Sequence, residues 1–216
     1  INIYELILNH VKDLGIPVNR LRSGKITQEE LKQIKDYKTC EHLWINDVSN
    51  LDVDKLVSIA TLHHKKHGLK LVVVDYLQLL STTKFKDQEI QQISYISKQL
   101  KGLSHKLNIP VVALVQFNKE AAKSNKPTKA LIYGSGQISK DSGAVILIHR
   151  EDYFDSKIRD NKYDPKNGIV EFIVDKNRFG KVGSAFAKWI PEKTSYEDIQ
   201  TGFIKRTEVT APKKVV

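Results

Sequence analysis

The sequence predicts an α/β fold in which a mostly parallel sheet is flanked by helices and ends in an antiparallel strand pair. Two short apolar runs, 71–74 and 110–115, each precede a polar residue, Asp75 and Gln116. Between them, apolar residues recur every three or four positions over 90–107, which is typical of an amphipathic helix. A strand, a helix and a strand in this order form a right-handed βαβ unit, so both polar residues should lie at the ligand-binding edge of the sheet.

The run that ends at Asp75 contains three consecutive valines, which indicates a strand buried on both faces, as in parallel sheets covered by helices. An aspartate at a strand end often serves only as a turn or cap residue. A carboxylate in this place can also hold a magnesium ion. The run alone leaves both interpretations of Asp75 open.

The N-terminal part of the chain predicts two helices and a short strand. The first helix covers 3–14, because its apolar residues have helical spacing before a glycine and a proline. Thr27 and Glu30 form a capping-box pattern at the start of a second helix that runs toward Tyr37. A strand is expected at 43–47.

The next helix should begin at a cap residue, Asn50 or Asp52, and end at Gly68. His63 and His67 lie one turn apart on it and could share a metal ion, but no acidic or cysteine ligand is near in sequence. A solvated basic helix end, which the helix dipole favours, is the preferred interpretation.

A basic segment follows the second strand of the βαβ unit and leads to the glycines of 134–136. Glycines offer unobstructed N–H groups and can let a phosphate backbone approach closely, while the alternative is a solvated surface loop. No GK[ST] follows, so these glycines do not form a phosphate loop of the Walker type. The lysines of the segment are Lys119, Lys123, Lys126 and Lys129.

The C-terminal half predicts a third buried strand at 142–149 and an antiparallel pair formed by 168–175 and 184–190. Lys176 and Arg178 follow the first strand of this pair and would project on the same side if that strand continued. Such cations can protect a sheet edge from aggregation. They can also complete a phosphate site on a neighbouring subunit.

The amino-acid composition restricts the class of protein to which this chain can belong. The chain has 216 residues, a formal net charge of +10 and a single cysteine, Cys40, so an internal disulfide and a cysteine metal cage are excluded. The longest apolar run is too short to cross a bilayer, and we expect a cytoplasmic protein. The positive charge favours a polyanionic partner, while a solvated lysine-rich surface is the alternative. We expect one domain over 1–198 and a loose tail over 199–216. The chain contains no Met, so we expect it to start inside a longer product.

Several segments, taken in their order, resemble those of a known family. The run V-D-Y-L-Q-L is similar to a Walker B strand, and K-N-R-F-G resembles a trans-acting finger motif. Residues 22–27 resemble the segment that follows the family's second motif. Residues 97–103 resemble its helix, and 108–116 its sensor strand. Through these segments the chain, over roughly 14–198, resembles the C-terminal motor domain of replicative hexameric DNA helicases of the DnaB type, a branch of the RecA-like ATPases. The matching segments are 22–27, 74–79, 97–103, 108–116 and 176–180.

The resemblance implies a role for individual residues in binding and hydrolysing ATP. Asp75 matches the Walker B carboxylate that holds the water shell of Mg²⁺, and Gln116 matches the sensor of the γ-phosphate. Lys176 and Arg178 match fingers that reach the nucleotide of the adjacent subunit. Arg150 matches an arginine near the nucleotide base.

The resemblance also implies a ring, expected to be a hexamer, that translocates on single-stranded DNA, with primase and a helicase loader as further partners. The loops 81–87 and 119–136 would then face the central channel. The residues expected to contact DNA are Lys119, Lys123, Lys126, Lys129, Gly134, Ser135 and Gly136.

The sequence departs from the family in two places. The first strand with its phosphate loop, and the catalytic glutamate, should lie before Ile1, so hydrolysis is expected of the intact protein and is left open for this chain alone. The Tyr-Gly-Ser-Gly run at 133–136 approaches that of phage-type ring helicases and favours a phage or mobile-element origin. Two alternatives remain: a recombinase or clock-type ATPase with the same fold, and a non-hydrolysing module for DNA binding or ring assembly.

Overall fold

A computed structural model of the chain describes residues 14–36, 42–118, 126–132, 134–161, 164, 166–191 and 195–199. The chain divides into two compact units, which are Ile1–Ala121 with Lys129–Ser142, and Ala122–Thr128 with Gly143–Val216. Most of the predicted helix 3–14, Cys40 and nearly all of the predicted tail lie outside the described residues. The predicted boundary at residue 198 therefore stays a prediction.

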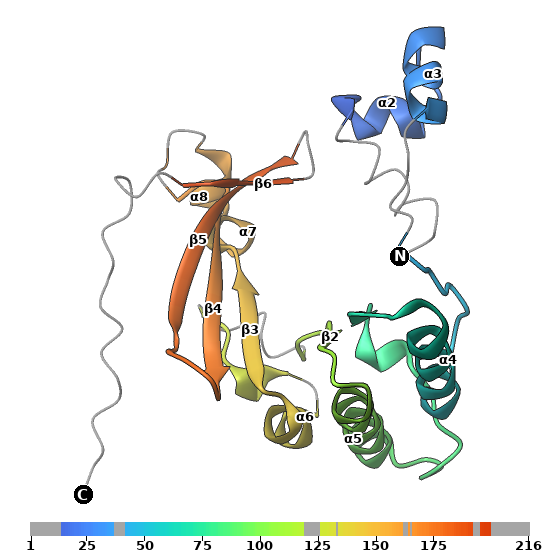
Figure 1. The fold of residues 1–216 in the computed structure, drawn as a ribbon. Helices are drawn as coiled ribbons and strands as arrows, with labels where there is room; N and C mark the ends of the chain where they lie inside the picture. Colours follow the sequence, from blue (N-terminus) through green and yellow to red (C-terminus); the bar gives the residue numbers. More distant parts are fainter. Residues whose placement is uncertain are drawn as a thin grey trace, which may run out of the picture. The chain divides into compact units, whose positions relative to one another are not determined.

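The first unit is built on the predicted βαβ arrangement (Figure 1). Strand β1 (Val72–Val74) pairs in parallel with β2 (Val111–Ala113), and α5 (Glu89–Leu107) connects them. The backbone N–H of Leu114 donates to the carbonyl of Val74 at 2.9 Å and extends the pairing beyond β2. The parallel pair and its crossover helix are thus confirmed.

Helix α5 buries the face that its apolar spacing predicts. Asn108 ends the helix in the left-handed conformation, and Ser97 donates from the buried face to Asp141 of α6 (Ser135–Asp141) at 2.8 Å. Ile90 lies in the first turn and is 67% exposed, so it does not belong to the buried face. The residues that the helix buries are Ile93, Ile96, Ser97, Leu100, Leu103 and Leu107.

Helix α4 (Val53–His67) begins and ends at predicted residues. Asp52 caps it by accepting from the N–H groups of Asp54 and Lys55, and Gly68 ends it with a φ of 64°. Its Ala60 joins a core cluster with apolar residues of α5, against which the inward side chains of β1 and β2 pack.

The other face of the parallel pair is open over the described residues. Val73 and Val112 point to this face and are 58% and 46% exposed. The prediction of a strand buried on both faces is therefore wrong for β1, because α4 and α5 pack against the face that carries Val72 and Val111. Alternation along a strand sends every second side chain to the face that these helices leave open.

The N-terminal segment confirms one prediction and corrects another. Thr27 and Glu30 make the reciprocal capping-box bonds, of 2.7 Å and 3.1 Å, at the start of α3 (Gln28–Asp36). A short helix that was not predicted, α2 (Val18–Arg22), precedes it. The strand predicted at 43–47 is absent from the described structure, where Trp44 instead packs its ring against two histidines of α4.

The second unit is a four-stranded antiparallel sheet in the order β3-β4-β5-β6 (Figure 1). The strands are β3 (Ala144–His149), β4 (Ile169–Asn177), β5 (Gly183–Ile190) and β6 (Ser195–Asp198). The predicted α/β fold with antiparallel C-terminal strands is confirmed, and β3 and β6 enlarge the predicted pair. The short helices are η2 (Leu77–Leu79), η4 (Lys129–Leu131), α7 (Glu151–Phe154) and α8 (Ser156–Asp160). None of the helices that the structure describes is long and apolar enough to cross a membrane.

Strand β3 is buried on one face only. Val145, Leu147 and His149 are buried, whereas Ile146 and Ile148 are more than half exposed. The prediction of a fully buried third strand is therefore half correct. An antiparallel ladder with β4 places alternate side chains of β3 on the opposite face, where Ile146 and Ile148 are exposed although Val170 of β4 is fully buried.

The buried His149 makes the stability of the second unit dependent on pH. Burial lowers the pKa of His149, although the carboxylates of Glu171 and Glu151 oppose the shift. An unfolded histidine takes up a proton below about pH 6.5, while the folded one stays neutral to a lower pH, so the free energy of unfolding falls as the pH drops through that window.

We expect His149→Gln to reduce this loss, because Gln takes up no proton. Chemical denaturation at pH 7 and pH 5 measures the difference, with His105→Gln, at an exposed position of α5, as the control. If the free energy of unfolding fell equally from pH 7 to pH 5 in the His149 variant and in the unaltered chain, the pH dependence could not be assigned to His149.

Candidate nucleotide and nucleic-acid site

The carboxyl edge of the parallel pair carries two exposed polar residues from different strands. Asp75 follows β1 directly, and Gln116 lies three residues beyond β2. The side-chain amide of Gln78 bridges the two segments, because it donates to the carbonyl of Gln116 and accepts from its N–H, both at 3.4 Å. A bond of 2.8 Å from the Leu77 N–H to the Leu114 carbonyl supports the same connection.

Gln78 makes a long-range contact that the sequence pattern did not single out. It belongs to the V-D-Y-L-Q-L run, but its partner lies 38 residues away. Only the parallel pairing of β1 with β2 brings that partner near.

Asp75 suits a cation that is bound through water. Its carboxylate is exposed, and among the described residues it has neither an ion pair nor a hydrogen bond. No group of three or more His, Cys, Asp or Glu that could hold a metal exists within the described ranges, His63 and His67 included. Mg²⁺ is commonly held by one or two carboxylates with substrate phosphates and water, and this arrangement fits such an ion.

A cavity of about 340 Å³ lies beside this edge within the first unit. Its lining contains one carboxylate, from Glu89, and no cationic side chain, so it does not offer the charge that a triphosphate needs. The lining residues are Asn50, Gln78, Leu80, Ser81, Thr82, Glu89, Gln92, Ile93 and Ile96.

Lys176 and Arg178 lie at the end of β4 in the second unit. The register with β3 skips Asp175, so Lys176 stands opposite the buried Val145. The strand ends at Asn177, and the N–H of Arg178 donates to the carbonyl of Gly143 at 2.9 Å. The condition for both side chains to share one strand face is therefore not met, since Arg178 belongs to the turn.

The turn after β4 is held by its own side chains. The N–H of Phe179 donates to Oδ1 of Asn177 at 3.1 Å, and Nδ2 of Asn177 donates to the carbonyl of Lys181. A Cβ on Gly180 would lie only 2.9 Å from Nδ2 of Asn177, so a larger residue would displace this side chain. The backbone around Arg178 is thus held by hydrogen bonds within the turn.

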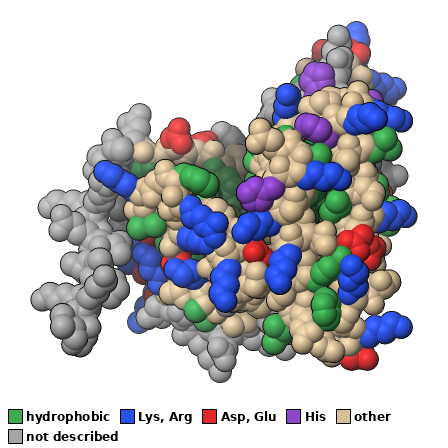
Figure 2. All heavy atoms as spheres, turned by 60° about the horizontal axis from the view of Figure 1, so that its bottom comes forward, with side chains coloured by type: hydrophobic (Ala, Val, Ile, Leu, Met, Phe, Trp, Pro, Cys, Tyr) green, Lys and Arg blue, Asp and Glu red, His purple; other side chains and the backbone are tan. Residues whose placement is uncertain are grey.

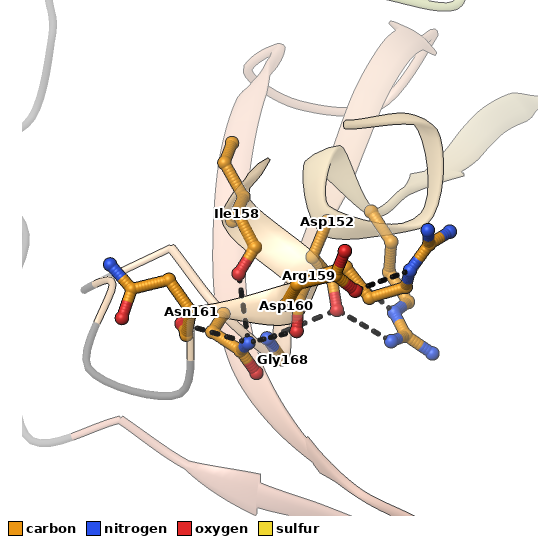
Figure 3. A network of polar contacts seen from close by, with 8 residues as sticks. Asp152, Ile158, Arg159, Asp160, Asn161 and Gly168 are labelled. Carbon is orange, nitrogen blue, oxygen red and sulfur yellow. Dashed lines mark hydrogen bonds and ion pairs between the residues drawn. The ribbon is translucent and has the colours of Figure 1, made fainter. Parts of the chain in front are cut away.

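Arg150 forms a two-pronged ion pair with Asp152, at 3.1 Å and 2.7 Å. Asp152 is a residue of α7 and also accepts from the N–H of Gly168, directly before β4 (Figure 3). Burial raises the pKa of Asp152, but the hydrogen bonds and charge of Arg150 outweigh burial and lower the pKa overall. Asp152 in turn raises the pKa of Arg150 through a hydrogen bond. Any contact of Arg150 with a nucleotide would use the part of its guanidinium that Asp152 leaves available.

The basic segment is only partly described. Lys119, Lys123 and the side chain of Ser135 lie outside the described residues. Lys126 pairs with Glu171 of β4 at 2.8 Å, and Lys129 begins η4. Figure 2 shows Lys and Arg side chains spread over much of the face drawn, with fewer acidic side chains among them.

The other predicted channel loop folds back on the first unit. Nζ of Lys84 donates to the hydroxyl of Tyr95 at 2.7 Å and lies 4.5 Å from the centre of its ring. The same hydroxyl donates to the carboxylate of Asp54. Phe85 and Asp87 both have a φ near 60°, which few residues other than glycine adopt.

A glycine is needed at position 134 for packing, which the sequence did not reveal. Its φ is 72°, and a Cβ at this position would lie 2.8 Å from Cγ2 of Ile93. Gly136, by contrast, lies within α6, where an added Cβ would meet nothing within 4 Å. The close approach at Gly134 is therefore to α5, and only Gly136 leaves open space for a ligand.

The two glycines can be separated by substitution. We expect Gly134→Ala to lower the free energy of unfolding by about 1–3 kcal/mol. The added methyl group would overlap Ile93, and the backbone at this position has a left-handed conformation that alanine rarely adopts. Gly136→Ala should raise it by up to about 1 kcal/mol, since alanine favours a helix interior. Urea denaturation of both variants is the measurement, and an equal effect of the two substitutions would refute the packing role of Gly134.

Comparison with known proteins gives consistent matches over most of the chain. The family described as DnaB-like helicase C terminal domain matches residues 5–198. The chain is 29% identical over 195 residues to the replicative DNA helicase DnaC of Bacillus subtilis (strain 168), which covers 88% of this chain and 42% of that protein. It is 35% identical over 166 residues to the replicative DNA helicase DnaB of Mycobacterium leprae, covering 74% of this chain and 26% of the relative.

Solved structures with the same fold agree with these matches. A DnaB-like replicative helicase, solved in a study of its interactions with primase, superposes with a TM-score of 0.77 at 25% identity and covers 93% of this chain and 49% of its own. A second solved structure, of an ATPase domain, gives the same TM-score at 24% identity, and the match covers 93% of this chain and 72% of that domain. The chain spans less than half the length of the curated relatives described here.

Proposed function

The chain belongs to the DnaB-like helicase C-terminal domain family, and we propose that in the intact protein it is part of an ATP-driven motor that moves along single-stranded DNA. The observation that carries the proposal is the placement of Asp75 and Gln116 at one edge of a parallel pair, bridged by Gln78. In open α/β sheets, ligands bind beyond the carboxyl ends of the strands.

Asp75 and Gln116 have distinct roles in the proposed site. A bound Mg²⁺ would bridge phosphate oxygens and neutralise charge that develops during phosphoryl transfer. The exposed carboxylate of Asp75 would orient the water shell of that ion. Gln116 would bind the terminal phosphate through its side-chain amide, while Gln78 fixes its backbone. The phosphate loop and the catalytic glutamate would come from other parts of the intact protein.

Lys176 and Arg178 would act on the nucleotide of a neighbouring subunit. A head-to-tail contact that repeats with rotational symmetry closes into a ring, and each interface then joins two different surfaces. The hydrogen-bonded turn at 177–181 supports such a role, because a backbone that is ordered before binding loses little further entropy when Arg178 binds phosphate. Arg150 would contribute near the base, and six subunits are the expected ring size.

The basic character of the chain supports single-stranded DNA as the polymer that the ring encloses. The formal net charge is +10, and contacts to phosphates through lysines give affinity that falls steeply with salt and depends little on sequence. The loops 81–87 and 119–136 would provide these contacts, with Lys119, Lys123 and Lys129 as the proposed phosphate ligands.

We also propose primase and a helicase loader as partners of the intact protein, and the cytoplasm as its location. The primase proposal follows from the structural relative, which was studied with primase.

The finger assignment predicts the effect of one substitution. Arg178→Ala in the intact protein should lower the rate of ATP hydrolysis by about 10³- to 10⁵-fold, the contribution of an arginine finger in other enzymes. Nucleotide binding should persist, because the finger stabilises charge on the transferred group. Steady-state hydrolysis and nucleotide-binding titrations measure the two effects.

Lys181→Ala is the matched control, since Lys181 lies in the same turn and is exposed. Unchanged turnover in the Arg178 variant would defeat the finger assignment. Absence of turnover in the unaltered intact protein would instead favour the non-hydrolysing module.

A further inference from the structure

Lys126 and Glu171 form an ion pair between the basic loop and the central part of the antiparallel sheet. Nζ of Lys126 lies 2.8 Å from Oε1 of Glu171, and the hydroxyl of Ser184 donates to the same oxygen at 2.6 Å. The Glu171 side chain is only 14% exposed, whereas that of Lys126 is 51% exposed. The carboxylate is therefore a largely buried charge that two groups stabilise.

Glu171 lies between strands on both sides. On β4 it stands opposite His149 of β3 and Phe186 of β5. The His149 ring is itself buried and keeps a lowered pKa, so it does not supply a positive charge near neutral pH. Among the described ion pairs, the cation that compensates Glu171 is Lys126. Removal of Lys126 would leave a buried carboxylate poorly compensated.

The ion pair also joins two parts of the proposed motor. Lys126 belongs to the segment that leads from Gln116 toward Gly134, and Glu171 is on the strand that ends in the finger residues. Glu171 and Lys176 share one face of β4, because their partners in β3 are His149 and Val145, which are four residues apart on that strand. The base of the loop is thus fixed to the strand and face that carry Lys176.

We infer that Glu171 is a positioning residue that anchors the basic loop through Lys126, and that Lys126 does not contact DNA directly. The inference rests on the proposed function and changes the role expected for Lys126. A phosphate that displaced the Lys126 ammonium from Glu171 would leave this carboxylate buried with only the Ser184 hydroxyl. Loss of the anchor would weaken DNA binding indirectly, because residues 126–128 would no longer be attached to β4 and would have to be ordered on binding.

Exchanging the charges of Lys126 and Glu171 distinguishes an anchoring role of Lys126 from a direct contact with DNA. Binding of a fluorescent oligo-dT to the intact protein is measured for Lys126→Glu, for Glu171→Lys, for the double exchange and for the control Lys129→Glu combined with Glu171→Lys. We expect each of the first two to weaken binding at least about tenfold, and the double exchange to recover most of the affinity. The control pair should recover nothing.

The result that would overturn the inference is a double exchange as weak as Lys126→Glu, because a phosphate ligand cannot be replaced from position 171. Unaltered affinity of both single variants would also overturn it.

A second measurement is independent of DNA. Hydrogen exchange of peptides covering 119–132 should be faster in Glu171→Gln than in the unaltered protein, while the thermal midpoint checks that the variant folds. Equal exchange would refute the anchor even if the protein bound no DNA. Failure of the unaltered protein to bind oligo-dT would instead count against the proposed function, so the two failures are distinguishable.

Discussion

The parallel pairing of β1 with β2 is the constraint on which the candidate nucleotide site depends. Two strands of three residues each form this pair, so the backbone bonds alone are few. Helix α5 supplies the remaining stabilisation, because its buried face packs with α4 against the inward side chains of both strands. Once the pair has formed, Asp75 and Gln116 come to the same edge, and Gln78 reaches the Gln116 backbone from the opposite segment. A slip in register would separate these groups.

Acidic residues of this basic chain hold its segments together from partly buried positions. Asp141 accepts from Ser97 and Gln137 and thereby joins α6 to α5. Asp152 holds Arg150 and the start of β4, and Glu171 holds the loop through Lys126. Each carboxylate is compensated by hydrogen bonds or a cation, as the cost of burying a charge requires. The excess of lysine and arginine is therefore left on the surface, where it is available to phosphates.

The sequence was sufficient for the local elements and for the strand ends, and insufficient for partners distant along the chain. The periodicity of α5, the capping box at Thr27 and the cap of α4 at Asp52 were all predicted, since each depends on neighbours within a few residues. The exposure of Val73 could not be predicted, because burial depends on which face the helices cover. The same limit applies to Gly134, whose contact with Ile93 spans two elements that periodicity treats separately.

The central claim is that one nucleotide site is shared between two copies of the chain. Mixing two inactive variants of the intact protein, Asp75→Asn and Arg178→Ala, tests it most directly through the rate of ATP hydrolysis. In a random equal mixture, roughly a quarter of head-to-tail interfaces would combine an intact Asp75 with a neighbour's intact Arg178, so hydrolysis should reappear in that proportion. If Asp75 and Arg178 of one subunit served the same site, every site in the mixture would contain one of the two substitutions. Mixed rings without any recovered hydrolysis would contradict the account.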